Sequence, residues 1–316
     1  MDIAILGNGF MGKKHKAVIN NIPFLSLIAE IDPNLAPHSS HNFQSIEDFI
    51  GRKISCDLVL IATPNHLHFI HAKTLLQNGY NVLIEKPFCF HKKEADELHA
   101  ISKETGKKIY LVMQNRFSSV SQYLKEIIST DQLGEIYNIQ FNAFWNRGNQ
   151  YYQPDSWKGK KNFDGGVLYT QFSHLIDLLF YTLNNSFKVS YKSLNKFRNT
   201  ENSEIEDSAI LILEAENKAK IIINFTTAVF EKNQETSLNI IAEKGTLKIA
   251  GQYFNEVVYR NITGEKSDQQ LQSTSNEENL ESLYLEILKD FDGKANTSIQ
   301  IEEGLSLINI LDEIYA

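Results

Sequence analysis

The pattern of apolar and polar residues changes its period about one third of the way along the chain. As far as residue 117, runs that are apolar on both faces alternate with amphipathic stretches, as in strand-like DIAILG followed by helix-like GFMGKKHKAVIN. Such strands, separated by helices, are typical of a parallel sheet that helices cover on both sides. Residues 1–117 are therefore predicted to form a doubly wound α/β domain of the Rossmann type.

The predicted elements of this first domain alternate regularly between strand and helix. Gly79 and Gly106 stand where two of the helices should end, because glycine readily adopts the left-handed backbone of a helix C-terminus. Strands are expected at 2–7, 25–32, 56–63, 81–87 and 107–114, and helices at about 9–20, 45–50, 66–79 and 92–106.

Residues 118–316 show the two-residue alternation of strands with one exposed face. Helices are expected at about 118–129, at about 170–183 and after Glu277, and the polar stretch 264–279 predicts a mobile loop. The second domain is therefore predicted to be α+β, with a largely antiparallel open sheet. The alternating stretches lie at 135–145, 189–197, 208–216, 219–230, 236–250 and 256–263.

Composition and charge narrow the function classes. A hydrophobic content of 42% over 316 residues is globular, and the net charge of -8 gives no reason to expect nucleic acid or anionic lipid as a partner. No apolar run approaches the ~20 residues of a membrane span, and strand-like sequence starts at Asp2, so we expect a cytoplasmic protein. Cys56 and Cys89 lack disulfide-like or metal-like spacing, which predicts a role in the core and no metal.

The sequence G-x-G-x-x-G lies between the first strand and the first helix. Its glycines allow the backbone to approach a pyrophosphate at the helix N-terminus, where free N–H groups favour an anion. Asp32 follows at the end of the second strand, where an acid binds ribose hydroxyls and repels a 2′-phosphate. The pattern predicts NAD rather than NADP, although a glycine turn without a nucleotide is the alternative. The predicted cofactor-binding residues are Gly7, Asn8, Gly9, Phe10, Met11, Gly12 and Asp32.

Two further motifs, TPNHLH and EKP, follow the third and fourth predicted strands. Open α/β sheets bind ligands beyond the carboxyl ends of their strands, so both motifs should lie on the cofactor side. The proline after Lys86 restricts that lysine to extended backbone geometry. These motifs add Thr63, Pro64, Asn65, His68, Glu85 and Lys86 to the predicted cofactor-binding residues.

Together, the glycine turn, TPNHLH, EKP and the later GGVLYTQFSHLIDLL resemble the Gfo/Idh/MocA oxidoreductases in order and spacing up to about residue 185. The resemblance implies a Rossmann domain, a sugar or polyol substrate, and a second domain whose open sheet often makes oligomer contacts. We therefore expect a homo-oligomer, a dimer or a tetramer. It also implies that Lys86 contacts substrate and nicotinamide ribose, that its bond to Pro87 is often cis, and that His174 is the acid/base.

Oxidation of a secondary alcohol needs such a pair of groups. A base within hydrogen-bond reach of the hydroxyl contributes about 10² to 10⁴ in rate, and histidine, with an ordinary pKa of about 6.5, suits neutral pH. Lys86 would then donate to the substrate oxygen, unless burial lowers its pKa enough to make it the base. Without the resemblance, the apolar helix around His174 would favour a core histidine.

One position departs from the family pattern. Many members carry an aspartate one helical turn before the histidine, where this chain has Thr170. The segment FWNRGNQYYQPDSWKG resembles the branch that acts on UDP-linked N-acetylated aminosugar uronates in surface polysaccharide assembly, where that aspartate is often replaced by asparagine. Its cations and aromatics suit a diphosphate and a carboxylate, with a solvated basic loop as the alternative. The predicted substrate-binding residues are Lys86, Arg147, Tyr152, Trp157, Lys158, Thr170, Gln171 and His174.

The sequence thus predicts an NAD-dependent oxidoreductase acting on a sugar hydroxyl, with a nucleotide sugar as the expected substrate. A dehydrogenase for a free polyol such as inositol or glucose is the first alternative, because it would not need the cationic segment. The second alternative is an NAD-binding regulatory homologue without turnover, which the absence of an aspartate at Thr170 leaves open.

Overall fold

The computed structural model describes residues 1–36, 41–183, 186–198, 200–252, 254–264 and 271–316. The chain forms two compact units, one of Met1–Met113 with Leu280–Ile308 and the other of Gln114–Asn279 with Asn309–Ala316. The first unit contains a six-stranded sheet and the second a seven-stranded sheet. The predicted α/β class, with a Rossmann domain and a second, mainly antiparallel sheet, is confirmed.

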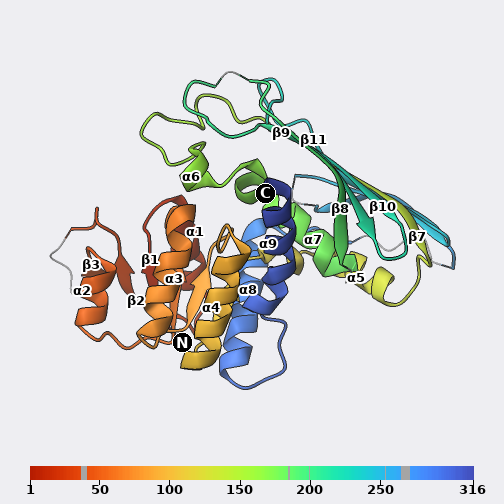
Figure 1. Cartoon of the computed structure of the whole chain (residues 1–316). Coiled ribbons are helices and arrows are strands. Elements are labelled where there is room, and N and C mark those ends of the chain that lie inside the picture. The colour runs from red at the N-terminus through yellow and green to blue at the C-terminus, as the bar shows by residue number, and fades with distance from the viewer. Residues whose placement is uncertain (37–40, 184–185, 199, 253, 265–270) are drawn as a thin grey trace. The chain divides into compact units, whose positions relative to one another are not determined.

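The first sheet has the strand order β3-β2-β1-β4-β5-β6, and all its pairings are parallel. The central strand β4 is fully buried, because helices such as α3 and α4 lie side by side along the sheet (Figure 1). The elements are β1 (Asp2–Leu6), α1 (Phe10–Asn21), β2 (Ser26–Ile31), β3 (Asn42–Phe43), α2 (Ile46–Gly51), β4 (Leu58–Ile61), the 3₁₀ turn η1 (Asn65–Leu67), α3 (His68–Gln77), β5 (Val82–Ile84), α4 (Lys92–Thr105) and β6 (Ile109–Leu111).

The C-terminal part of the chain returns to this first unit, which the sequence-based boundary at residue 117 did not include. Two helices, α8 (Asn276–Phe291) and α9 (Ile301–Tyr315), stand where one closing helix was expected. The Leu111 N–H donates to the carbonyl oxygen of Ile299 at 2.8 Å, so the segment between these helices extends the hydrogen bonding of β6. An amphipathic pattern identifies a helix, but it does not identify the surface that the helix covers.

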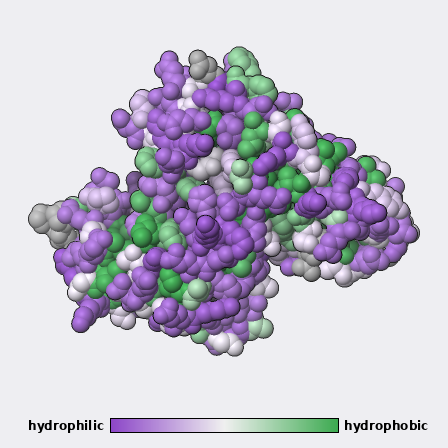
Figure 2. Space-filling model, viewed as in Figure 1, coloured by the Kyte–Doolittle hydropathy of each residue, from purple (hydrophilic) through white to green (hydrophobic). Residues whose placement is uncertain are grey.

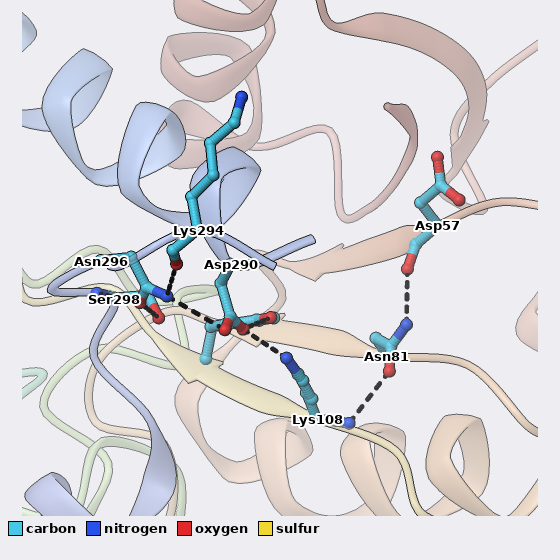
Figure 3. A network of polar contacts seen from close by, with 8 residues as sticks. Asp57, Asn81, Lys108, Asp290, Lys294, Asn296 and Ser298 are labelled. Carbon is cyan, nitrogen blue, oxygen red and sulfur yellow. Dashed lines mark hydrogen bonds and ion pairs between the residues drawn. The ribbon is translucent and has the colours of Figure 1, made fainter. Parts of the chain in front are cut away.

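A network of polar contacts ties α8 to the sheet (Figure 3). The Lys108 ammonium donates to Asp290 at 2.6 Å, and the Tyr110 hydroxyl donates to the same carboxylate. The backbone N–H of Lys108 donates to the Asn81 side chain, whose own amide donates to the carbonyl of Asp57. Desolvation opposes ionisation of Asp290, but the bonds from Lys108 and Tyr110 outweigh it and lower the pKa of the carboxyl.

The second sheet has the strand order β13-β12-β11-β7-β10-β9-β8, and every pairing is antiparallel except that of β7 with β10. One face of this sheet packs against α5 and α7 (Figure 1). The elements are the 3₁₀ turn η2 (Gln114–Phe117), α5 (Ser119–Ser129), β7 (Ile136–Phe144), α6 (Lys161–Asp164), the π-helical turn η3 (Leu168–Phe172), α7 (Ser173–Leu183), β8 (Phe187–Asn195), β9 (Ser208–Ala215), β10 (Lys220–Thr226), β11 (Glu235–Ala242), β12 (Gly245–Ala250) and β13 (Glu256–Ile262).

Several predicted boundaries shift in the second unit. The stretch predicted at 236–250 is a hairpin of β11 and β12, and the helix predicted at 170–183 begins with the π-helical turn η3. Of the loop predicted at 264–279, residues 265–270 lie outside the described residues and the last four begin α8.

A buried ion pair fixes α7 against the turn η2. Arg116 Nε donates to Asp177 Oδ2 at 2.8 Å, and a second guanidinium nitrogen donates to Oδ1 at 2.6 Å. Both side chains are almost completely buried, so each charge depends on the other for compensation. The ion pair therefore sets the position of the helix that carries His174.

Candidate functional site

Two positions of the glycine turn in the first unit, Gly7 and Gly12, leave no room for a side chain. A Cβ on Gly12 would lie 1.9 Å from the Gly7 carbonyl oxygen, and a Cβ on Gly7, whose φ is +104°, would lie 2.6 Å from the Ala62 oxygen. Gly9, the N-cap of α1, has open space beside it and no side-chain cap. The first turn of α1 carries no acidic residue, so its N–H groups fit a pyrophosphate.

Asp32 lies next to this turn, immediately after β2. Its Oδ2 accepts the Asn8 N–H at 2.8 Å, and its Oδ1 accepts the Asn34 N–H at 2.9 Å. The carboxylate is half-buried, so it retains access to a ligand. This geometry supports the predicted ribose contact, which remains a prediction.

The ends of β4 and β5 are joined by His68. Its Nδ1 lies 2.7 Å from the carbonyl oxygen of Pro87, and its Nε2 lies 2.8 Å from the carbonyl oxygen of Thr63. The side chain is buried; burial lowers the pKa of His68, while the two carbonyl oxygens act in the opposite direction. Both ring nitrogens face backbone oxygens, so the geometry gives His68 a positioning role, and the direct cofactor contact predicted from the sequence remains a prediction.

The other residues of TPNHLH lie around the same strand end. Asn65 is buried at the start of η1, whereas Thr63 and Pro64 are half-buried. The Thr63 hydroxyl lies 3.1 Å from Nδ1 of His71 in the next helical turn. The motif thus forms the link from β4 to α3, as the order of the predicted elements implied, and its place on the cofactor side remains a prediction.

The EKP motif contains the cis Lys86–Pro87 peptide that the resemblance implied. The Glu85 carboxylate is buried rather than open to solvent. Its Oε1 lies 2.9 Å from Nε2 of His15, and its Oε2 accepts the backbone N–H of Lys86 at 3.0 Å. Glu85 therefore holds the backbone of Lys86, a role the sequence did not assign; its predicted cofactor contact remains a prediction.

In the second unit, the segment after β7 brings together four residues. Arg147 Nε donates to the Gln171 side chain at 2.6 Å, and the Gln171 amide donates to the Tyr151 hydroxyl at 2.7 Å. The Arg147 guanidinium lies 5.4 Å from the centre of the Tyr151 ring, and the Lys158 ammonium lies 4.3 Å from it. We call Arg147, Tyr151, Lys158 and Gln171 the cationic cluster.

Burial sets the protonation of this cluster. It raises the pKa of Tyr151 to about 12, so the phenol stays neutral and accepts the hydrogen bond from Gln171. Burial also lowers the pKa of Lys158, while the charge of Asp164 acts in the opposite direction. The cluster thus places two cationic side chains against one neutral ring.

Two other predicted substrate-binding residues, Tyr152 and Trp157, are not part of the cationic cluster. Tyr152 is buried, and its ring fills the space beside Gly159, where a Cβ would lie 2.7 Å away. Trp157 is half-buried. Lys160 lies 4.0 Å from Glu204 and outside the cationic cluster. Tyr152 therefore supports the loop from within, and its predicted contact with substrate remains a prediction.

The sequence-based prediction missed Asp164, which is completely buried at the end of α6. It accepts the Gly159 N–H at 2.7 Å and the hydroxyl of Thr170. A carboxylate therefore adjoins Thr170, the position at which the resemblance led us to expect an aspartate. The only signal in the sequence was an aspartate directly before the pair Gly165 and Gly166.

Thr170 and Gln171 lie in the π-helical turn η3, and half-buried His174 lies in the first turn of α7. Single π-helical turns are rare and occur often at functional sites. The described residues contain no group of three or more His, Cys, Asp or Glu side chains that could hold a metal. None of the described helices is long and apolar enough to cross a membrane.

Two family models match the chain. Residues 1–113 match the oxidoreductase family with an NAD-binding Rossmann fold, and residues 121–248 match the Gfo/Idh/MocA C-terminal domain. With the parallel sheet and the glycine turn, these matches define an NAD-binding oxidoreductase. The chain belongs to the Gfo/Idh/MocA family, as its motifs predicted.

The fold is also that of solved dehydrogenases. The WlbA dehydrogenase of Bordetella pertussis, solved with NADH and UDP-GlcNAcA, is 26% identical, with a TM-score of 0.92 over 100% of this chain and 94% of that chain. The WlbA dehydrogenase of Chromobacterium violaceum, solved with the same ligands, is 24% identical, with a TM-score of 0.89 over 100% and 92%. At this identity the second likeness shows the fold alone.

Curated relatives are more distant in sequence or match over a shorter length. Glucose-6-phosphate 3-dehydrogenase of Bacillus subtilis is 23% identical over 279 residues, which cover 83% of this chain and 77% of that protein. The uncharacterised oxidoreductase YdgJ of Escherichia coli is 32% identical over 124 residues, which cover 38% of this chain and only 34% of YdgJ.

Proposed function

We propose that this oxidoreductase is an NAD-dependent dehydrogenase for a secondary hydroxyl of a UDP-linked N-acetylaminosugar uronate, in surface polysaccharide synthesis. The observation that carries the proposal is the cationic cluster, two cations held over one phenol ring in a chain of net charge -8. The likeness to the WlbA dehydrogenase solved with UDP-GlcNAcA supports the same substrate class.

Arg147 is the member of the cluster best suited to a diphosphate or a carboxylate. Its Nε donates to the Gln171 side chain and its Nη1 donates to the Asn146 carbonyl oxygen, so the guanidinium plane is fixed. Its Nη2 makes no hydrogen bond with the described residues, and we assign this group to an anionic oxygen of the substrate. Lys158 would add a point charge.

When bound, NAD accepts the hydride that leaves the sugar carbon. We assign His174 as the base that takes the hydroxyl proton and Lys86 as the donor that positions the hydroxyl oxygen. In these roles, each residue should increase the turnover number by a factor of at least about 10². Lys86→Met and His174→Ala should therefore lower kcat by that factor or more while NADH binding, followed by fluorescence, persists.

Calorimetry of the NADH-loaded protein with UDP-GlcNAcA tests the substrate class. Arg147→Ala should weaken UDP-GlcNAcA binding by about 10- to 100-fold, because a charge-assisted contact to a desolvated anion contributes about 1.5 to 3 kcal/mol. NADH binding should not change. Lys160→Ala is the matched control, since Lys160 lies in the same loop but faces Glu204.

Failure of UDP-GlcNAcA to bind in this titration would contradict the proposal. If UDP-GlcNAcA fails to bind the NADH-loaded wild type while free myo-inositol or glucose binds, the enzyme acts on a free polyol. If neither class of sugar binds and no sugar reduces bound NAD, the protein is a homologue without turnover.

We also propose that the protein is a homo-oligomer, joined through the face of the second sheet that α5 and α7 leave uncovered. The strand register places Tyr191, Ile210, Ile241 and Tyr259 on this face, and all four are exposed. Figure 2 shows apolar side chains among polar ones over the strands of this sheet. A monomer mass by native mass spectrometry would contradict the proposal, and Ile210→Lys should convert the oligomer to monomers.

A further inference from the structure

A chain of buried polar groups ends on the backbone of Lys86. His15, on α1, is completely buried, with its Nε2 2.9 Å from Glu85 Oε1 and its Nδ1 2.7 Å from the hydroxyl of Tyr284 on α8. The other oxygen of Glu85 accepts the Lys86 N–H at 3.0 Å. Residues from α1, from the end of β5 and from α8 are therefore linked in one line of hydrogen bonds, all within the first unit.

The donors and acceptors of this chain have one consistent direction. A carboxylate only accepts, so the His15 Nε2 that faces Glu85 must carry a proton. The Tyr284 hydroxyl lies 2.7 Å from the other ring nitrogen, Nδ1, and can donate to it. Burial, together with the charge of Glu85, raises the pKa of Tyr284 well above its ordinary value, so this hydroxyl keeps its proton. The hydrogen bonds of this buried network therefore run in one direction, with Tyr284 as the first donor and Glu85 as the last acceptor.

Stability alone does not account for such a chain. Replacing buried, hydrogen-bonded charged groups by apolar side chains of similar volume is often neutral or stabilising. The pyrophosphate cradle is formed by the glycines and the first turn of α1, and it does not need His15. What the chain adds is a fixed orientation for Glu85, whose second oxygen holds the backbone of the predicted substrate-contacting lysine.

We infer that His15 is a positioning residue for Lys86: it orients the Glu85 carboxylate, which fixes the Lys86 backbone and so the point from which its side chain extends. The inference rests on the proposed function, which assigns Lys86 to the substrate oxygen. Residues that orient a site through a hydrogen bond, as around metal centres, typically contribute about 10- to 100-fold to activity.

Two substitutions of the same residue test the inference. Glutamine places its amide N–H where the His15 Nε2–H stands, so His15→Gln keeps the bond to Glu85. Asparagine places its amide near Nδ1, so His15→Asn keeps a group beside Tyr284 and loses Glu85. With NAD and UDP-GlcNAcA, His15→Asn should lower kcat by about 10- to 100-fold, with KM and the NADH Kd changed less than about threefold. His15→Gln should retain kcat within about threefold.

A pair of tyrosines keeps the test valid if the His15 variants do not fold. Tyr284 and Tyr110 are both completely buried and both use their hydroxyls, Tyr284 on His15 and Tyr110 on Asp290. Each phenylalanine variant removes one buried hydroxyl from the same unit. Tyr284→Phe should lower kcat severalfold, whereas Tyr110→Phe should lower only the midpoint of urea unfolding.

Crystal structures of the His15 variants provide a readout that does not depend on turnover. The Lys86 side chain should be displaced in His15→Asn and unmoved in His15→Gln. An undisplaced Lys86 in His15→Asn, or equal losses of kcat in both variants, would overturn the inference. If Lys86→Met itself keeps wild-type turnover, the proposed function fails, and displacement of Lys86 in the crystal still decides whether His15 positions it.

Discussion

The two units fix their predicted site residues by different means. In the first unit, Lys86 and Pro87 are held through backbone groups, by the buried side chains of Glu85 and His68. In the second unit, Arg147 and Lys158 are held through their own side chains, by the Gln171 amide and the face of Tyr151.

This difference matches the ligand that we propose for each unit, a dinucleotide for the first and a sugar for the second. A dinucleotide presents the same pyrophosphate and ribose in every reaction, so backbone N–H groups and strand ends can bind it. Sugars differ in their substituents, and a loop whose specificity resides in side chains can change without altering the fold. Substitutions in the cationic cluster should therefore change substrate specificity more readily than substitutions in the glycine turn change cofactor binding.

The largest expected effect comes from Gly12→Ala. The new Cβ would lie 1.9 Å from the Gly7 carbonyl oxygen, so the start of α1 must move away from β1. NADH affinity should fall by at least about 100-fold, the loss of one or two charge-assisted hydrogen bonds, and stability should fall with it. Fluorescence titration and urea unfolding measure the two effects.

Gly9→Ala is the matched control for this prediction. Its Cβ would meet no atom within 4 Å, so the fold should keep its stability, and any fall in NADH affinity would come from the methyl group itself rather than from a displaced helix. Wild-type NADH affinity in Gly12→Ala would contradict the role of the turn.

A smaller effect, now in the second unit, is expected from Asp164→Ala. The change leaves the Gly159 N–H without its buried acceptor, at a cost of about 1 to 3 kcal/mol, whereas the Thr170 hydroxyl loses one of two acceptors and keeps the main-chain carbonyl oxygen of residue 164. Asp164→Asn keeps an acceptor and should cost less. The free energy of unfolding measures both, and an Ala variant as stable as the Asn variant would show that the carboxylate is not a structural support.

Asp32→Ala should change cofactor preference by roughly tenfold in favour of NADP, because it removes a charge that repels the 2′-phosphate. Asp32→Asn separates charge from hydrogen bonding, since the amide oxygen still accepts the Asn8 N–H. Calorimetry with NAD and NADP measures the preference. Equal wild-type affinity for the two nucleotides would remove the role assigned to Asp32.

The smallest expected effect is a pH dependence of stability that originates in the first unit. Burial lowers the pKa of His71 from 6.5 to about 4. Because the folded-state value is the lower one, protons bind the unfolded chain preferentially. Stability is therefore fully present above about pH 6.5 and is lost as the pH falls toward 4, by about 1 to 3 kcal/mol after allowance for partial exposure.

Urea unfolding of the wild type and of His71→Asn at pH 7.5 and 4.5 checks this sign. The variant should lose less stability than the wild type between the two pH values. Identical losses would show that His71 does not contribute.

Much of the first unit was predictable from the sequence because its determinants are local. The period of apolar residues identified each strand of the parallel sheet except the two-residue β3, whose length is too short to show a period. The glycine spacing and Asp32 located the cofactor turn, because the strand, turn and helix that form it are consecutive. The apolar run that forms β5 located Lys86 just beyond the end of this strand for the same reason.

The tertiary structure alone decided which distant residues meet. His15 contacts Tyr284 across 269 positions of the chain, Lys108 contacts Asp290 across 182, and neither pair has a sequence motif in common. Asp164 was ordinary in the sequence and becomes a completely buried acceptor only once α6 and the π-helical turn fold around it. Hydrophobic periodicity specifies the face that an element buries, but it does not specify the partner surface, because apolar contact is non-directional.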